Sequence, residues 1–226
     1  MSDRDTHGDT HGDTTAQRPA EADATARPRP EAATYIVATF NAHKAAELHA
    51  LLALPGVTLR AVAEWPGAAA PEETGTTLLE NARIKARAAV AIAGMPAIAD
   101  DTGLEVDALN GAPGVYSARY AGEGATYADN VARMLRELSG VPAEQRTARF
   151  RTVCVCAWPD GRELVAEGVL EGVLLAETRG TNGFGYDPLF VPAGETRTFA
   201  EMTDAEKNAI SHRSRAVRAL AALLRG

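Results

Sequence analysis

The chain is poor in the residues that crosslinked or metal-built folds depend on. Only two of its 226 residues are cysteines, Cys154 and Cys156, which is too few for a disulfide framework or a cysteine zinc site. No apolar run approaches the roughly 20 residues of a transmembrane helix. The N-terminus also lacks the apolar segment of a secretory signal. These absences predict a cytoplasmic protein with no membrane partner.

Positive charge is also scarce. The chain has 23 lysines and arginines against 30 aspartates and glutamates, a formal net charge of −7. Nucleic-acid binders need a broad positive field, so we expect no nucleic-acid partner. With 46% apolar residues, a chain of this length can bury a core as one large domain or two small ones.

The first 33 residues differ in composition from the rest. They hold seven acidic and four basic side chains, and their only apolar residues are Met1 and alanines. Such a segment buries too little apolar surface to offset the entropy of ordering, so we predict a disordered tail over 1–33. Its paired histidines and aspartates suit at most a weak metal site. The folded domain is then 34–226.

From Tyr35 onward, short apolar runs alternate with helical patterns, which indicates an α/β fold. Thr77-Leu78-Leu79-Glu80 is a capping box that starts one helix, and Thr203-Asp204-Ala205-Glu206 starts the last. The predicted strands are 35–39, 57–62, 96–99, 148–158 and 163–175.

Asp100 and Asp101 directly follow the predicted strand 96–99. Ligands in open α/β sheets bind beyond the carboxyl ends of strands. Two adjacent carboxylates there suit Mg²⁺, and one of them could orient or deprotonate an attacking water. The dipeptide taken alone fits a simple turn better.

A second acidic loop, Pro71-Glu72-Glu73-Thr74-Gly75, precedes the capped helix. Carboxylates at that place also stabilise a helix N-terminus through its dipole. If this loop meets Asp101, the two form a divided metal site.

Two basic segments are candidate anion contacts. Thr39-Phe40-Asn41-Ala42-His43-Lys44 occupies a strand-to-helix turn, where backbone amides and a lysine favour phosphate. It contains no glycine, so a routine loop is an equal alternative. Glu206–Arg213 places Lys207 and Ser211 on one helix face beside His212 and Arg213. A solvated helix is the alternative for this segment, and for Lys85 between Arg83 and Arg87.

Gly180–Pro188 is the most unusual stretch, with three glycines beside Phe184, Tyr186 and Asp187. Glycine lets the backbone approach a flat ligand, an aromatic ring can stack on it, and the carboxylate accepts hydrogen bonds. A tight structural turn is the alternative.

Taken together, these motifs resemble the non-canonical purine nucleoside triphosphate pyrophosphatases, also called inosine triphosphatases. The resemblance covers nearly all of the chain after the tail. The matching stretches are Tyr35–Lys44 with Glu47–Leu48, Glu72–Gly75, Glu80–Arg87, Ala99–Leu104, Gly111–Tyr120, Gly183–Pro188 and Glu206–Arg213.

The resemblance implies a homodimeric, Mg²⁺-dependent enzyme that converts ITP, dITP and XTP to the monophosphate and pyrophosphate, cleansing the nucleotide pool. It implies a long mixed β-sheet with flanking helices in two lobes around a central cleft. By position, Asp101 is the proton acceptor and a metal ligand, with Glu72 as second ligand, although Glu73 is equally placed. The implied substrate contacts are Thr39, Phe40, Asn41, Ala42, His43, Lys44, Lys85, Thr102, Phe184, Gly185, Tyr186, Asp187, Lys207, His212 and Arg213.

The chain departs from the family pattern at three positions. Phe40 and His43 replace two glycines of the first loop, and Thr102 replaces the usual serine. Phe40 either points away from the substrate or reshapes the triphosphate pocket. Two other functions stay open: a Maf-like pyrophosphatase of other modified nucleotides, or, because the first loop has lost both glycines, a nucleotide-binding protein without turnover.

Overall fold

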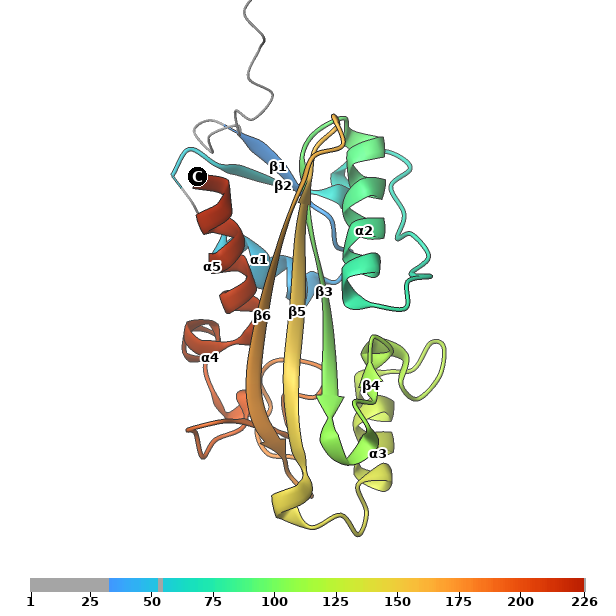
Figure 1. Ribbon diagram of the computed structural model, residues 1–226, viewed down its shortest axis with the longest axis vertical. Coiled ribbons are helices and arrows are strands. Elements are labelled where there is room, and N and C mark those ends of the chain that lie inside the picture. The colour runs from blue at the N-terminus through green and yellow to red at the C-terminus, as the bar shows by residue number, and fades with distance from the viewer. Residues whose placement is uncertain (1–32, 53–54, 226) are drawn as a thin grey trace, which may run out of the picture.

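A mixed seven-stranded sheet runs through the chain (Figure 1). The computed structural model describes residues 33–52 and 55–225, so the predicted disordered tail lies outside these residues except for Ala33. The strand order is β2-β1-β3-β5-β6-β7, with β4 pairing beside β3. The strands are β1 (Thr34–Val37), β2 (Thr58–Ala61), β3 (Ala97–Val106), β4 (Pro113–Gly114), β5 (Thr147–Ala157), β6 (Glu163–Leu174) and β7 (Phe190–Pro192). The helices are α1 (Ala42–Leu51), α2 (Leu78–Ala93), α3 (Tyr127–Glu137), α4 (Asp204–Ile210) and α5 (His212–Arg225).

The central strands are much longer than those at the edges. β1 lies parallel to β2 and β3, whereas the remaining pairs are antiparallel. β3 pairs with β5 from Ala97 opposite Ala157 to Val106 opposite Ala148. β5 and β6 form a long hairpin whose turn contains Gly161, at φ 88°. The long strands β3, β5 and β6 therefore run from one end of the molecule to the other and contribute residues to both ends.

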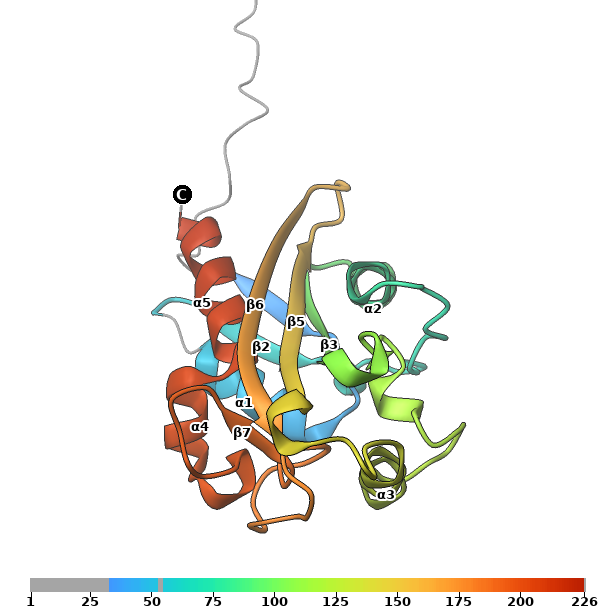
Figure 2. The same cartoon turned by 60° about the horizontal axis from the view of Figure 1, so that its bottom comes forward.

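Helices cover both faces of the long strands. Figure 2 shows α2 on one side of β3 and β5, and α5 on the other. The α2 side is packed with small residues such as Ala82, Ala86 and Ala89. The α5 side contains larger ones, including Val217 and Leu220. These small alanine side chains let α2 lie close to the sheet.

A third core forms the other lobe around the far ends of the long strands. Leu104 of β3, Phe150 of β5 and Phe190 of β7 pack there with Met134 of α3. Met202 and Phe199 close the same cluster from the segment before α4. The predicted architecture, a mixed sheet with flanking helices in two lobes, is confirmed.

Two element predictions were wrong. The strand predicted to end at Ala99 continues to Val106, so Asp100 and Asp101 lie inside β3 and not in a turn beyond it. The C-terminal helix is broken at Ser211, whose ψ of 155° is extended. The Ser211 hydroxyl accepts a hydrogen bond from the backbone N–H of Ser214 at 3.1 Å, which caps the start of α5. Ile210, Val217 and Leu224 recur every seven residues across this break, so the sequence pattern does not reveal it.

None of the helices that the structure describes is long and apolar enough to cross a membrane.

Candidate active site

A cavity of about 230 Å³ lies between the two lobes. Its lining comes from the start of α1, from α2 and β3, from α3, from the loop before β7 and from the junction of α4 with α5. Among the predicted site residues, those that line it are Thr39, Phe40, Asn41, Lys44, Lys85, Asp101, Thr102, Phe184, Gly185, Tyr186, Asp187, Lys207, His212 and Arg213. Ala42, His43 and Glu72 do not line it.

Asp101 is held by Lys85 of α2. Lys85 Nζ donates to Asp101 Oδ1 at 2.6 Å and lies 3.4 Å from a carboxylate oxygen of Glu73. Burial alone lowers the pKa of Lys85, but Asp101 and Asp100 outweigh it and raise the pKa above its usual value. Asp101 Oδ2 is buried and accepts no hydrogen bond. One carboxylate oxygen of the cavity is thus fixed and the other is available to a ligand.

Asp100 has a different set of partners, because successive side chains of a strand point to opposite faces. Its Oδ2 accepts from Arg213 Nε and Nη2, each at 3.2 Å, and lies 3.4 Å from Lys44 Nζ. Burial alone raises the pKa of Asp100, but the charges of Lys44 and Arg213 hold it far below its usual range. Asp100 therefore anchors cations and does not line the cavity, so Asp101 is the carboxylate of this pair that can meet a ligand there.

Thr102 joins the same hydrogen-bond network. Its Oγ1 lies 3.1 Å from Asp100 Oδ2, accepts from Arg213 Nη2 at 3.1 Å and is 2.7 Å from Thr152 Oγ1. Thr102 therefore contributes a hydroxyl group to this network, and a serine would supply the same group.

The first loop turns into α1 through Asn41. Asn41 Oδ1 accepts from the backbone N–H of His43 at 3.0 Å and of Lys44 at 3.2 Å, so it caps the helix. Phe40 lines the cavity, but 44% of the residue is exposed to solvent, so it is only partly enclosed there. Ala42 and His43 lie outside the lining, and His43 instead stacks on Phe184, with ring centroids 5.1 Å apart.

The glycine-rich loop is built around Asp187. Asp187 Oδ2 accepts from the backbone N–H of Phe184 at 2.8 Å and from Lys207 Nζ at 2.7 Å. Gly183 has a φ of 73°, and a Cβ there would lie 2.1 Å from the same oxygen. The loop therefore requires a glycine at position 183. Tyr186 is buried and donates its hydroxyl to the carbonyl of Ser117 at 3.0 Å.

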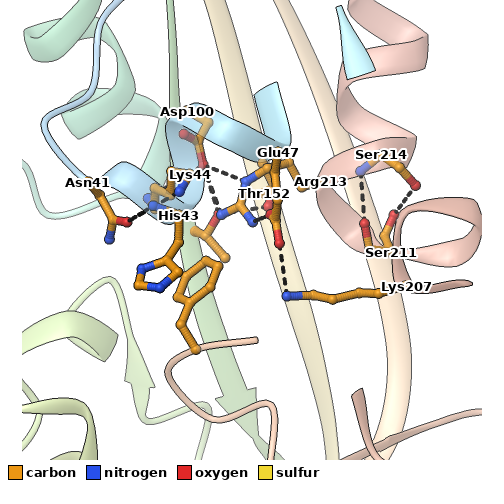
Figure 3. Close-up of polar contacts among 12 residues, drawn as sticks. Asn41, His43, Lys44, Glu47, Asp100, Thr152, Lys207, Ser211, Arg213 and Ser214 are labelled. Carbon is orange, nitrogen blue, oxygen red and sulfur yellow. Dashed lines mark hydrogen bonds and ion pairs between the residues drawn. The ribbon is translucent and has the colours of Figure 1, made fainter. Parts of the chain in front are cut away.

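Glu47 of α1 connects the cations of the C-terminal helices, as Figure 3 shows. It accepts from Lys207 Nζ at 2.9 Å and from Arg213 Nη1. Burial alone raises the pKa of Glu47, but Arg213 and Lys207 lower it below its usual value. Burial raises the pKa of Asp187 in spite of the opposing charge of Lys207.

His212 is buried against aromatic rings. Its imidazole stacks on Phe150 with centroids 4.5 Å apart, and Nδ1 is buried without a hydrogen-bond partner. Burial, together with the charges of Arg213 and Lys207, lowers its pKa well below the usual value. The ring is therefore neutral at pH 7.

The cavity carries no excess of positive charge. Each cation that lines it is ion-paired: Lys44 with Asp100, Lys85 with Asp101 and Glu73, Arg119 with Glu123, Lys207 with Glu47 and Asp187, and Arg213 with Glu47 and Asp100. A polyanionic ligand must therefore exchange these partners or bring a cation of its own.

The residues present fit a Mg²⁺ ion held largely by the substrate. Over the residues that the structure describes, no group of three or more His, Cys, Asp or Glu side chains could hold a metal. Asp101 has a free buried oxygen and Glu73 lines the same cavity, whereas Glu72 is exposed and outside it. Mg²⁺ needs only one or two carboxylates when water and phosphate complete its shell.

Sequence reasoning missed several residues of the site. Glu47 and Asp100 hold the cations, and Tyr127, Asn130, Ser117 and Arg119 line the cavity. Glu47, Asp100, Ser117 and Arg119 fall within stretches that match the family pattern, whereas Tyr127 and Asn130 lie outside all of them.

A carboxylate with a free oxygen, beside clustered cations and an aromatic wall between two lobes, is the kind of site that binds and hydrolyses a nucleotide. The fold and this cavity thus define a nucleotide hydrolase of the α/β class. The chain belongs to the Ham1 family, whose model matches residues 35–223.

The relatives match most of this chain and nearly all of their own length. A protein of Exiguobacterium sibiricum, named dITP/XTP pyrophosphatase, is 48% identical over 189 residues, which cover 84% of this chain and 96% of that protein. The structure of a HAM1 protein from Coxiella burnetii matches with a TM-score of 0.78 and 42% identity, covering 85% of this chain and 98% of that one. A nucleoside-triphosphatase, or dITP/XTP pyrophosphatase, from Mycobacterium abscessus matches with a TM-score of 0.68 and 46% identity, covering 84% and 98%. The predicted family is confirmed.

Proposed function

We propose that this chain hydrolyses the non-canonical purine nucleotides dITP, XTP and ITP to the monophosphate and pyrophosphate, with Mg²⁺ as cofactor. The names of its relatives support the reaction class and the substrates. The observation that carries the chemistry is the buried, unpaired Oδ2 of Asp101 inside a cavity of paired cations.

Asp101 holds the attacking water. Lys85 occupies Oδ1, which fixes the carboxylate and leaves Oδ2 to accept a proton from a water molecule in the cavity. Oriented in this way, the water attacks the α-phosphorus and pyrophosphate leaves on the opposite side. Positioning and electrostatic stabilisation supply most of the catalysis.

The cations bind the phosphates by exchanging partners. Lys44, Lys85 and Arg213 line the cavity and are held in place by carboxylates, so little side-chain entropy is lost on binding. When bound, Mg²⁺ supplies the positive charge that this balanced site lacks and polarises the phosphate oxygens. Asp101 and Glu73 are the residues that would hold it.

The base is selected by N–H donors. Lys207 and His212 line the cavity with donor groups. The 6-oxo group of hypoxanthine or xanthine accepts such a hydrogen bond, whereas the 6-amino group of adenine is itself a donor. A buried donor left unpaired makes this discrimination large, in favourable cases ~10⁴-fold.

The proposal includes a cytoplasmic homodimer that cleanses the nucleotide pool, with no nucleic-acid or membrane partner. The family resemblance supports the dimer, and the net charge of −7 supports the absence of a nucleic-acid partner. Light scattering on the purified full-length chain measures the oligomeric state.

A nucleotide panel tests the function. Purified protein is incubated with Mg²⁺ and dITP, XTP, ITP, dUTP, dATP or dGTP, and pyrophosphate and orthophosphate are measured separately. We expect pyrophosphate from the first three and none after chelation of Mg²⁺. Preferred cleavage of dUTP would instead favour the Maf-like alternative. Tight binding of dITP without any product would favour a nucleotide-binding protein.

A further inference from the structure

Three aromatic rings from separate segments meet at the cavity. The His43 ring, at the start of α1, stacks on Phe184 at 5.1 Å with an interplanar angle of 25°. Tyr127, the first residue of α3, lies 5.8 Å from Phe184 and 6.3 Å from His43. Phe184 and Tyr127 line the cavity, whereas His43 covers Phe184 from outside it. Figure 3 shows His43 projecting from α1.

Tyr127 also holds the first loop. Its hydroxyl oxygen accepts a hydrogen bond from Asn41 Nδ2 at 2.9 Å, while Asn41 Oδ1 caps α1. Tyr127 therefore contacts two walls of the cavity. Phe184 lies 57 residues after it in the sequence, and Asn41 lies 86 residues before it.

The Phe184 ring needs such support because of its backbone. It stands between Gly183 and Gly185, which both have positive φ, and it belongs to neither a helix nor a strand. Its backbone N–H is bound by Asp187, but neither flanking glycine has a side chain that could pack against the ring. Aromatic pairs stabilise each other beyond their buried area, so the contacts with His43 and Tyr127 favour one orientation of the Phe184 ring.

We propose that Tyr127 and His43 are positioning residues that hold Phe184 as a fixed wall for the base of the nucleotide. This inference rests on the proposed function and adds two residues to base recognition. The rings gather where Lys207 Nζ lies 4.7 Å from the Phe184 centroid, whereas Asp101 is paired with Lys85 on α2. The cluster therefore acts on base affinity and leaves the hydrolytic step unchanged.

Two probes separate these effects. Inosine monophosphate contains the base, and its binding is measured by calorimetry without any turnover. Inorganic tripolyphosphate has no base, and its inhibition constant reports on the phosphate contacts alone. The variants are Tyr127→Ala, which removes two ring contacts, Tyr127→Phe, which removes only the hydroxyl, and His43→Ala. Tyr116→Ala is the matched control, because Tyr116 is 51% exposed and outside the cavity lining.

We expect Tyr127→Ala and His43→Ala to raise the Kd for inosine monophosphate and the KM for dITP about tenfold. We expect kcat and the tripolyphosphate constant to stay within twofold. Tyr127→Phe should lose at most threefold in affinity, and Tyr116→Ala should match the unmodified protein.

Two results would overturn the inference. One is an unchanged Kd in both Tyr127→Ala and His43→Ala, and the other is an equal loss for tripolyphosphate, which marks a general structural defect. Should Tyr127→Ala not fold, His43→Ala decides alone, since His43 is exposed on the surface. If dITP is not hydrolysed but inosine monophosphate binding depends on these rings, the proposed function fails and the positioning role stands.

Discussion

Lys85 Nζ and Asp101 Oδ1 lie 2.6 Å apart and join α2 to the middle of β3, while Asp101 Oδ2 has no partner. This arrangement gives a single carboxylate two separate functions. One oxygen is held by a buried ammonium group and sets the orientation of the other. The second oxygen is buried without a hydrogen-bond partner in a residue that lines the cavity.

Replacing Asp101 by asparagine should lower kcat at least ~100-fold, because an amide cannot accept the proton of the attacking water. Pyrophosphate release from dITP under saturating Mg²⁺ measures the effect. The variant should remain folded by circular dichroism. Asp160→Asn, in the exposed turn between β5 and β6, is the control and should keep full activity. Activity of Asp101→Asn within a few-fold of the unmodified protein would refute this role.

The two glutamates of the acidic loop should behave differently towards Mg²⁺. Glu73 lines the cavity and lies 3.4 Å from Lys85, whereas Glu72 is exposed. We expect Glu73→Gln to raise the Mg²⁺ concentration for half-maximal activity about tenfold, as for loss of one ligand contact. Glu72→Gln should leave it within twofold. The reverse outcome would favour the original sequence prediction of Glu72.

Asp100 should matter mainly for stability. Its carboxylate is buried beside Arg213 and Lys44, so Asp100→Asn leaves the buried Arg213 and the partly buried Lys44 with less compensation. We expect a loss of about 3 kcal/mol in the free energy of unfolding, measured by urea denaturation at pH 7. Because its pKa is lowered on folding, this stabilisation is present above a pH of about 4 and is lost below it.

A matched exposed pair serves as the control for Asp100→Asn. Glu64 and Arg60 form an ion pair four residues apart on the surface. Glu64→Gln should leave the unfolding midpoint unchanged, because exposed pairs contribute little. Equal effects of both substitutions would contradict a special role of burial.

His212 should make the protein less stable in mild acid. Its pKa is lowered well below 6.5 on folding, so the unfolded chain takes up a proton that the folded chain does not. The free energy of unfolding should therefore fall as the pH decreases from about 6.5, by up to about 1.4 kcal/mol per pH unit. Urea denaturation between pH 7 and 5 measures this slope. His212→Gln should reduce it, whereas the exposed control His49→Gln should retain it.

Local sequence patterns determined much of the fold. The predicted capping boxes at Thr77 and Thr203 both start helices, and the long hairpin of β5 and β6 lies close to its predicted limits. These features depend on neighbouring residues, so periodicity and capping chemistry suffice to find them. The family motifs likewise pointed to fourteen residues that line the cavity.

Only the tertiary structure decided what each charged residue contacts. Asp100 and Asp101 are adjacent in the sequence, but the alternation of a strand sends one to Arg213 and the other to Lys85. That alternation was hidden because Asp, Thr and Gly also suit a turn.

The same holds for pairs that are far apart in the chain. Glu47 meets Lys207 across 160 residues, and Asn41 meets Tyr127 across 86. Such pairings are set by how helices dock on the sheet, and no local pattern encodes them. The sequence by itself thus determined most of the elements, the family and the choice of Asp101 as the candidate catalytic residue. The tertiary structure decided which cations are neutralised, which glutamate reaches the cavity and how Phe184 is held, because each depends on groups brought together only by folding.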